Sequence, residues 1–222
     1  MLVVSYGGSI IAPEEIDAEF IDGVASCLEN TEDSVCVVVG GGEVARKYIE
    51  KGRELGANES LLDEIGILAT RMNAYLLLCA LGNDAYPRVA DTINEAITAD
   101  SRFVVMGGTV PGHTTDAVAA LLAERLGSKK LVLATSVDGV YTSDPKLDRN
   151  AKKIKELRAG ELVAIVAKNS AKAGAKSVMD LLGARIIERS GMECWIFDGR
   201  NLEDFRRALK GDREGFSGSI IG

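Results

Sequence analysis

Short apolar runs alternate with longer amphipathic stretches along most of the chain. Five runs are rich in valine, isoleucine and leucine and are each followed by Gly, Thr or Asp: Leu2–Tyr6, Ser34–Val39, Phe103–Met106, Lys130–Ala134 and Glu193–Phe197. A strand that is buried on both faces of a parallel sheet has this nearly continuous apolar character. We therefore expect five buried parallel strands.

The stretches between these runs carry apolar residues at helical spacing. They are Pro13–Glu29, Glu43–Leu55, Ser60–Leu81, Thr115–Leu126, Gly160–Ala167 and Ser177–Arg189. Alternation of strands and helices predicts an α/β protein with a three-layer α/β/α arrangement, in which helices cover both faces of an open, mainly parallel sheet. The tail Gly215–Ile221 is expected to form a closing turn and an edge strand, and Lys146–Lys155 a loop.

The stretch Ser60–Leu81 has a special feature. Its first half is amphipathic, but Ala74–Leu81 is apolar all round. A helix without a polar face either lies in the centre of the core or is covered by another subunit. Both possibilities stay open, and the second predicts a dimer or a higher oligomer.

Composition and charge narrow the classes of partner. The chain has 222 residues, of which 46% are hydrophobic, so it can bury one sizeable core. Its net charge of −7 repels polyanions at long range, which makes nucleic acids and anionic membranes poor partners. A site for phosphate would have to be built locally, from backbone N–H groups and a few cations.

The cysteines and the N-terminus indicate a cytoplasmic protein. The four cysteines are widely spaced and contain no Cys-x-x-Cys pair, so we expect buried reduced thiols. A single histidine makes a structural zinc site a poor interpretation. The apolar segment at the N-terminus is too short for a signal peptide.

Three glycine-rich segments follow predicted strands: Gly7-Gly8-Ser9, Gly40-Gly41-Gly42 and Gly107-Gly108-Thr109. We call them the first, second and third glycine elbows. Ligands of an open parallel sheet bind at the carboxyl ends of its strands, where glycine lets the backbone approach a ligand and a following helix N-terminus favours phosphate. One such turn is usually only a tight connection. Three at the ends of separate strands predict a phosphate or nucleotide site.

Other well-known motifs are missing. No elbow has the Gly-x-x-x-x-Gly-Lys-Ser/Thr pattern of a Walker loop or the Gly-x-Gly-x-x-Gly pattern of a dinucleotide site with its downstream acid. A Ser/His/Asp triad would have to use His113, and no Gly-x-Ser-x-Gly elbow accompanies it.

Further motifs extend the elbows into an ordered series. Arg46 follows the second elbow, Pro111–Asp116 follows the third, and Thr135–Pro145 and Val178–Asp180 come later. Over the whole chain this series resembles the amino acid kinase family, and in particular its archaeal-type branch. The segment Thr135–Pro145 is highly specific for the family and Pro111–Asp116 for the branch. The resemblance implies transfer of the γ-phosphoryl group of ATP to UMP.

The resemblance also implies an ATP site. Gly8, Ser9 and Gly42 would contact the phosphates or the transferring group, and Arg46 would add positive charge. The other three residues, Thr135, Tyr141 and Asp144, would hold the adenosine. Mg²⁺ would bridge the ATP phosphates with few direct protein ligands. The implied ATP-binding residues are Gly8, Ser9, Gly42, Arg46, Thr135, Tyr141 and Asp144.

For UMP, the resemblance implies a second group of residues. Asp63 can accept hydrogen bonds from both ribose hydroxyls, which would select a nucleotide over a simple phosphate ester. Thr114 and Thr115 stand where a helix begins, so they could contact phosphate or uracil, although capping alone would also explain them. We expect His113 to shape the loop or contact substrate. The implied UMP-binding residues are Gly41, Asp63, Pro111, Gly112, His113, Thr114, Thr115, Asp116 and Ala117.

Catalysis in this family is implied to rest on Asp180, Arg46 and Ser9. The acceptor oxygen of UMP is already anionic near neutral pH, so transfer depends on positioning and charge stabilisation and requires no general base. Asp180 would orient the phosphate-binding groups, unless it only begins a helix. Many family members have a lysine where this chain has Ser5. Arg46 and Lys176 are the candidates to supply its charge.

The family also suggests a division of the chain and an assembly. A single domain, residues 1–222, would consist of an N-lobe to about residue 126, with UMP and the subunit interface, and a C-lobe, 127–222, with ATP. The assembly would be a hexamer built as a trimer of dimers. Two alternatives stay open: the same fold with another acceptor (a carbamate, acylated amino acid, aspartate or isopentenyl phosphate), or a nucleotide-binding or storage protein without catalysis.

Overall fold

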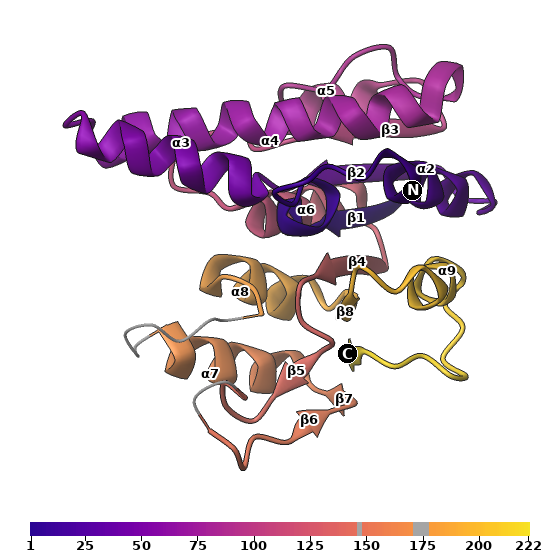
Figure 1. The fold of residues 1–222 in the computed structure, drawn as a ribbon. Helices are drawn as coiled ribbons and strands as arrows, with labels where there is room; N and C mark the ends of the chain where they lie inside the picture. The colour runs from indigo at the N-terminus through magenta and orange to yellow at the C-terminus, as the bar shows by residue number, and fades with distance from the viewer. Residues whose placement is uncertain (146–147, 171–177) are drawn as a thin grey trace.

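A seven-stranded sheet forms the middle layer of the protein (Figure 1), and the computed structural model describes residues 1–145, 148–170 and 178–222. The order across the sheet is β3-β2-β1-β4-β8-β9-β7, and β5 and β6 form a separate antiparallel pair. The strands are β1 (Leu2–Tyr6), β2 (Val35–Val39), β3 (Phe103–Met106), β4 (Lys130–Thr135), β5 (Val140–Tyr141), β6 (Lys153–Ile154), β7 (Glu156–Leu157), β8 (Glu193–Asp198) and β9 (Ser219–Ile221).

The five predicted strands are confirmed, and they form a continuous parallel block of the sheet, from β3 to β8. The prediction of an edge strand in the tail is wrong. β9 lies between β8, to which it is antiparallel, and β7, to which it is parallel. The two-residue β7 is too short to show a periodic pattern, and it falls just after the predicted loop Lys146–Lys155, which itself contains β6.

All six predicted helices are present; Thr115–Leu126 has the predicted bounds, and each of the other five differs at one or both ends. The first begins at Ala18 because Asp17 caps it by accepting a hydrogen bond from the Phe20 N–H, and the last begins at Leu181 after its cap, Asp180. The short α1 and α5 and the C-terminal α9 were not predicted. The helices are α1 (Gly8–Ile11), α2 (Ala18–Glu29), α3 (Gly42–Glu54), α4 (Glu59–Leu81), α5 (Ile93–Thr98), α6 (Thr115–Leu126), α7 (Ala159–Ser170), α8 (Leu181–Ser190) and α9 (Leu202–Lys210).

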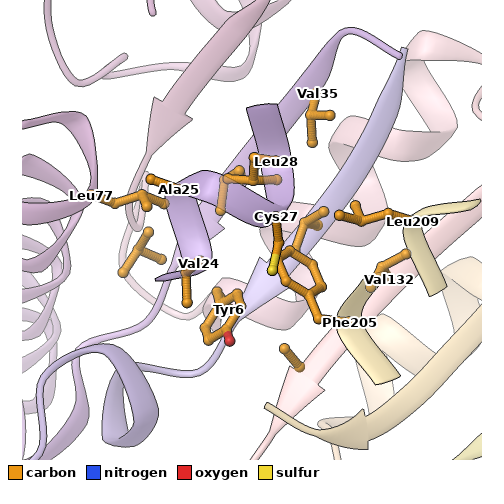
Figure 2. Close-up of a cluster of buried hydrophobic side chains, with 14 of the residues drawn as sticks. Tyr6, Val24, Ala25, Cys27, Leu28, Val35, Leu77, Val132, Phe205 and Leu209 are labelled. Atoms are coloured by element: carbon orange, nitrogen blue, oxygen red, sulfur yellow. The ribbon is translucent and has the colours of Figure 1, made fainter. Parts of the chain in front are cut away.

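Two clusters of buried side chains, one on each face of the sheet, hold the layers together. One cluster joins the strands to α2, α4 and α9; part of it, around Tyr6, Leu28 and Phe205, is drawn in Figure 2. The other joins the opposite faces of the same strands to α5, α6, α7 and α8. Alternate residues of each strand contribute to opposite clusters, as the pleat of a strand requires. The predicted α/β/α arrangement is confirmed.

The four cysteines are free thiols. Cys27, Cys36 and Cys194 are buried as expected, and burial raises the pKa of the Cys36 thiol to about 12. Cys79, on α4, is exposed, so the expectation of a buried thiol is wrong at this position. It lies on the outward side of a helix that only partly enters the core.

α4 has one buried side and one exposed apolar side. Ala74, Leu77 and Leu81 are buried against the sheet and α2, so α4 is a partly buried core helix. The outward apolar residues are Leu61, Leu68, Met72 and Tyr75, with exposed fractions of 53%, 60%, 63% and 47%. Among the described residues, one helical stretch, Glu59–Asp84, has the length and composition of a membrane span, with 39% of its most apolar window buried. Core helices of soluble proteins can have the same length and composition.

Candidate active site at the carboxyl edge of the sheet

The first two glycine elbows meet in direct backbone contact. β1 and β2 are neighbours, and the Gly40 N–H donates to the Tyr6 carbonyl at 2.9 Å. A Cβ placed on Gly8 would lie 2.2 Å from the Gly42 nitrogen and 2.3 Å from the Gly40 oxygen. Only glycine allows this approach. The convergence that the sequence predicts for these two elbows is therefore present.

The third elbow joins the site through α4. The Gly108 N–H donates to Thr70 Oγ1 at 2.7 Å, and a Cβ on Gly107 would lie 2.5 Å from the same oxygen. Asn73, one turn further along α4, donates from Nδ2 to the carbonyls of Gly40 and Gly41 at 2.9 and 3.0 Å. Sequence reasoning missed both side chains, because polar residues in the middle of a helix carry no motif.

A cavity of about 520 Å³ lies between the second elbow, α4 and the loop after the third elbow. We call it the elbow cavity. Asp63 stands at its rim, where Oδ2 accepts a hydrogen bond from the Gly112 N–H at 2.8 Å. The polar side chains that line the cavity are Arg46, Asp63, Thr70, His113, Thr114 and Thr115.

The structure brings most of the expected UMP residues into this cavity. Gly41, Asp63, Gly112, His113, Thr114 and Thr115 line it. Pro111, Asp116 and Ala117 do not. The Asp116 carboxylate turns to Ser5, whose Oγ donates to Oδ1 at 2.8 Å, and Ala117 is buried beneath the cap that Thr114 provides.

Two residues expected at the ATP phosphates also line the elbow cavity. Gly42 has a φ of +60°, which favours glycine, and Arg46 stands one turn further along α3. The Arg46 guanidinium pairs with Glu43 at 2.7 Å. Ser9, another expected catalytic residue, lies at the junction of the first two elbows: a Cβ on Gly42 would be 2.9 Å from its nitrogen.

A second cavity, of about 300 Å³, is built around the turn that joins β4 to β5. We call it the turn cavity. Tyr141 and Asp144, both expected at the adenosine, line it together with the turn 136–140. Thr135 ends β4 just before this turn and is not part of the lining. The two cavities have no lining residue in common.

Charged side chains define the turn cavity. The Tyr141 hydroxyl and Lys153 Nζ donate to the Asp138 carboxylate at 3.1 and 3.0 Å. Burial alone would raise the pKa of Asp138, but these hydrogen bonds and the charge of Lys153 outweigh it and lower the pKa. Asp198 pairs with Arg200 at 2.6 Å and its pKa is lowered in the same way, against the effect of burial. Both carboxylates are therefore ionised at neutral pH.

The C-terminal strand anchors this turn. The Val140 N–H donates to Ser219 Oγ at 2.8 Å, and the same hydroxyl donates to the Ile154 carbonyl at 2.6 Å. Ser219, Asp198 and Arg200 were not predicted as parts of the site. They follow the turn by about 60 to 80 residues, and only the pairing of β8 with β4 and β9 brings them beside it.

Two carboxylates mark the junction between the halves of the chain. Asp180 caps α8 by accepting from the Gly183 N–H, and it also accepts a hydrogen bond from the Thr114 hydroxyl at the start of α6. Burial raises the pKa of Asp116, two residues after Thr114, to about 6; the charge of Asp180 adds to this rise, and the Ser5 hydrogen bond opposes it. Lys176, the other candidate cation, lies outside the described residues.

Comparison with known proteins gives a consistent result. The amino acid kinase family matches residues 1–198. The uridylate kinase of Pyrococcus abyssi is 46% identical over 218 residues, covering 96% of this chain and 97% of that protein, and that of Methanothrix thermoacetophila is 48% identical over 219 residues, covering 97% of each. The crystal structure of uridylate kinase from Archaeoglobus fulgidus covers 100% of both chains with a TM-score of 0.88 and 43% identity. A UMP kinase structure from Bacillus anthracis, at 21% identity and a TM-score of 0.80, shares the fold.

Proposed function

The chain belongs to the amino acid kinase family, and on this premise we propose that it transfers the γ-phosphoryl group of ATP to UMP, giving ADP and UDP. It is an ATP-dependent nucleoside monophosphate kinase. The observation that carries this assignment is identity of 44% to 48% to archaeal uridylate kinases along almost their whole length. The alternatives with another acceptor or without catalysis are disfavoured by the same identity.

We propose that UMP occupies the elbow cavity and ATP the turn cavity. Asp63, at the rim of the elbow cavity, accepts from the ribose hydroxyls of UMP. Tyr141 and Asp144 hold the adenosine of ATP, with the tyrosine ring against the base. The phosphates of both nucleotides then meet at the contact between Gly8 and Gly42, where backbone N–H groups supply partial positive charge.

Transfer at this contact depends on positioning and on charge stabilisation. Arg46 turns from Glu43 to the transferring group, and Ser9 contributes its backbone N–H and hydroxyl. Asp180 orients the Thr114 hydroxyl, to which it is already bonded. Mg²⁺ arrives with ATP: the described residues contain no group of three or more His, Cys, Asp or Glu side chains arranged to hold a metal. Its charge would offset that of the phosphates.

The same proposal covers the lobes and the assembly. Residues 1 to about 126 form the UMP lobe and 127–222 the ATP lobe. The protein is soluble, and we place it in the cytoplasm. The outward apolar residues of α4, Leu68, Met72 and Tyr75 among them, form the contact within a dimer, and three dimers form a hexamer. A monomeric mass at micromolar concentration would contradict this assembly.

A coupled assay of ADP formation tests the activity. The protein is incubated with ATP and Mg²⁺ and with UMP, CMP, dUMP or isopentenyl phosphate as acceptor. We expect UMP to give the highest kcat/KM and UDP to appear in equal amount with ADP. Binding of both nucleotides without ADP formation would support the non-catalytic alternative, and a higher kcat/KM with isopentenyl phosphate would support another acceptor.

A further inference from the structure

α4 carries a polar side of which the proposed reaction uses only Asp63. Asp63, Thr70 and Asn73 follow one another at helical spacing: Asp63 contacts the loop after the third elbow, Thr70 the third elbow and Asn73 the second. Thr70 and Asn73 are buried, with exposed fractions of 7% and 2%. A buried polar side chain requires hydrogen-bond partners. Here the partners are the backbones of the second and third elbows.

Asn73 fixes two successive peptides of the second elbow. Its Nδ2 donates to the carbonyl of Gly40 at 2.9 Å and to that of Gly41 at 3.0 Å. In a planar trans peptide the C=O and the following N–H point in opposite directions. Because both carbonyls point to α4, the N–H groups of Gly41 and Gly42 point away from α4, and Gly42 nitrogen lies beside Gly8.

Thr70 and Arg71 fix the third elbow in the same way. The Gly108 N–H donates to Thr70 Oγ1 at 2.7 Å, and Thr70 Oγ1 in turn donates to the Ile67 carbonyl at 2.6 Å. The Gly108 carbonyl accepts from Arg71 Nε at 3.4 Å. A glycine backbone has more accessible conformations than any other residue, so these contacts remove freedom that the elbows would otherwise keep.

We propose that Asn73 is a positioning residue for phosphoryl transfer, and that Thr70 has the same role for the third elbow. Asn73 holds the second elbow with its N–H groups directed at the place where the two phosphate chains meet, and Thr70 holds the third elbow against the elbow cavity. In this role Asn73 acts through the carbonyls of Gly40 and Gly41, and Thr70 acts through the Gly108 N–H. The proposal rests on the proposed function, because it assigns a purpose to groups that would bind phosphate.

Two variants of Asn73 test it in the full-length protein with ATP, Mg²⁺ and UMP. Asn73→Leu keeps the approximate size and removes both donors. We expect kcat to fall at least about tenfold while the KM for UMP changes less than about threefold, because the N–H groups stabilise charge that develops in the transition state. Asn73→Asp places a carboxylate against two carbonyls at high pH, whereas its protonated form donates to one of them. Its kcat, relative to the wild type, should therefore rise as the pH falls from 8 to 6.

Lys130→Met is the matched control. Lys130 Nζ also donates to two carbonyls, those of Ala208 and Leu209 at 2.6 and 2.9 Å, but it does so at the start of β4, at the opposite edge of the sheet. This variant should lose thermal stability and keep its kcat at temperatures where it is folded. Any of three results would overturn the proposal. Folded Asn73→Leu could have the kcat of the wild type, or the kcat of Asn73→Asp relative to the wild type could be independent of pH. Lys130→Met could also lose as much kcat as Asn73→Leu.

Two variants of Thr70 test the proposal independently if the Asn73 variants do not fold. Thr70→Val is isosteric and lacks the hydroxyl, and Thr70→Ser retains it. We expect Thr70→Val to raise the KM for UMP at least about tenfold and Thr70→Ser to stay within about twofold of the wild type. Equal kinetics of these two variants would overturn the proposal. A wild type that forms no UDP would instead contradict the proposed function itself.

Discussion

The elbow cavity and the turn cavity are built from different materials. Five glycines, Gly41, Gly42, Gly66, Gly108 and Gly112, are among the residues that line the elbow cavity, and the contact of Gly42 with Gly8 leaves no space for a single carbon atom. The turn cavity is formed by side chains that pair with one another, as Tyr141 does with Asp138 and Arg200 with Asp198. The first should respond sharply to added volume, and the second gradually to lost hydrogen bonds. The following predictions test this contrast, beginning with the largest effect.

Gly8→Ala should abolish the meeting of the elbows. The new Cβ would lie within 2.3 Å of backbone atoms of the second elbow, which cannot move aside as a flexible side chain can. We expect kcat/KM to fall about a thousandfold or more, a loss of about 4 kcal/mol of transition-state stabilisation. Gly160→Ala, in α7, is the control, because its Cβ would meet only the end of the Glu188 side chain, at 3.3 Å. Gly8→Ala with near-normal activity would show that the contact is dispensable.

Asp116→Asn should change the pH dependence of stability at the junction of the two halves. The pKa of Asp116 in the folded protein, about 6, is above its ordinary value of 3.8, so the folded state binds the proton more tightly than the unfolded state. The wild type therefore loses stability as the pH rises from about 4 to about 6, and the variant does not lose this part. Above about pH 6.5 the variant should gain up to about 3 kcal/mol relative to the wild type. Urea unfolding of both proteins at several pH values measures the difference, and a constant difference would refute the shift.

Asp63→Asn should weaken the binding of UMP more than the binding of ATP. The amide can still accept from the Gly112 N–H but offers the ribose hydroxyls one acceptor in place of two. We expect the KM for UMP to rise about thirtyfold and the KM for ATP to change less than about twofold. The preference for UMP over dUMP should narrow as well. An equal rise of both KM values would place Asp63 outside the ribose site.

Arg46→Ala should lower turnover at least about tenfold, or about 1.4 kcal/mol of barrier. The guanidinium is well exposed beside Glu43, with 61% of its side chain accessible, so its removal should hardly affect the fold. Arg46→Lys is the control for charge without the planar geometry. A smaller loss of turnover would mean that a cation other than Arg46 supplies the charge that many family members obtain from a lysine at the position of Ser5.

Tyr141→Phe should give the smallest effect. The variant keeps the aromatic face and loses the hydrogen bonds to Asp138, which Lys153 still contacts at 3.0 Å. We expect the KM for ATP to rise about threefold and the KM for UMP to stay unchanged. A hundredfold change would mean that the turn cavity is as intolerant as the elbow cavity.

The parallel strands and the glycine elbows of the site could be predicted from the sequence. Continuous apolar strands such as Leu2–Tyr6 are local patterns, and the elbows follow them directly. The contacts that complete the site join residues far apart in the chain. Ser5 and Asp116 are separated by 111 positions, and Asn73 and Gly40 by 33. Nothing in the spacing of a mid-helix asparagine tells which backbone it will meet.

The prediction that the tail forms an edge strand is wrong for a related physical reason. Ser219–Ile221 has the composition of a strand, but its place in the sheet depends on β7, whose two residues give no period to recognise. Arg200 follows β8 and precedes α9, where a charged residue usually faces solvent. Its position in the turn cavity follows from the parallel pairing of β8 with β4.

The insertion of β9 between β7 and β8 has a consequence for biosynthesis. The ribosome delivers every lining residue of the elbow cavity by position 115, so that cavity can assemble while the rest of the polypeptide is being made. The turn that joins β4 to β5 instead depends on the Ser219 hydroxyl, about 80 residues after Val140. If UMP and ATP occupy the two cavities as proposed, nascent chains stalled before this serine should bind UMP but not ATP.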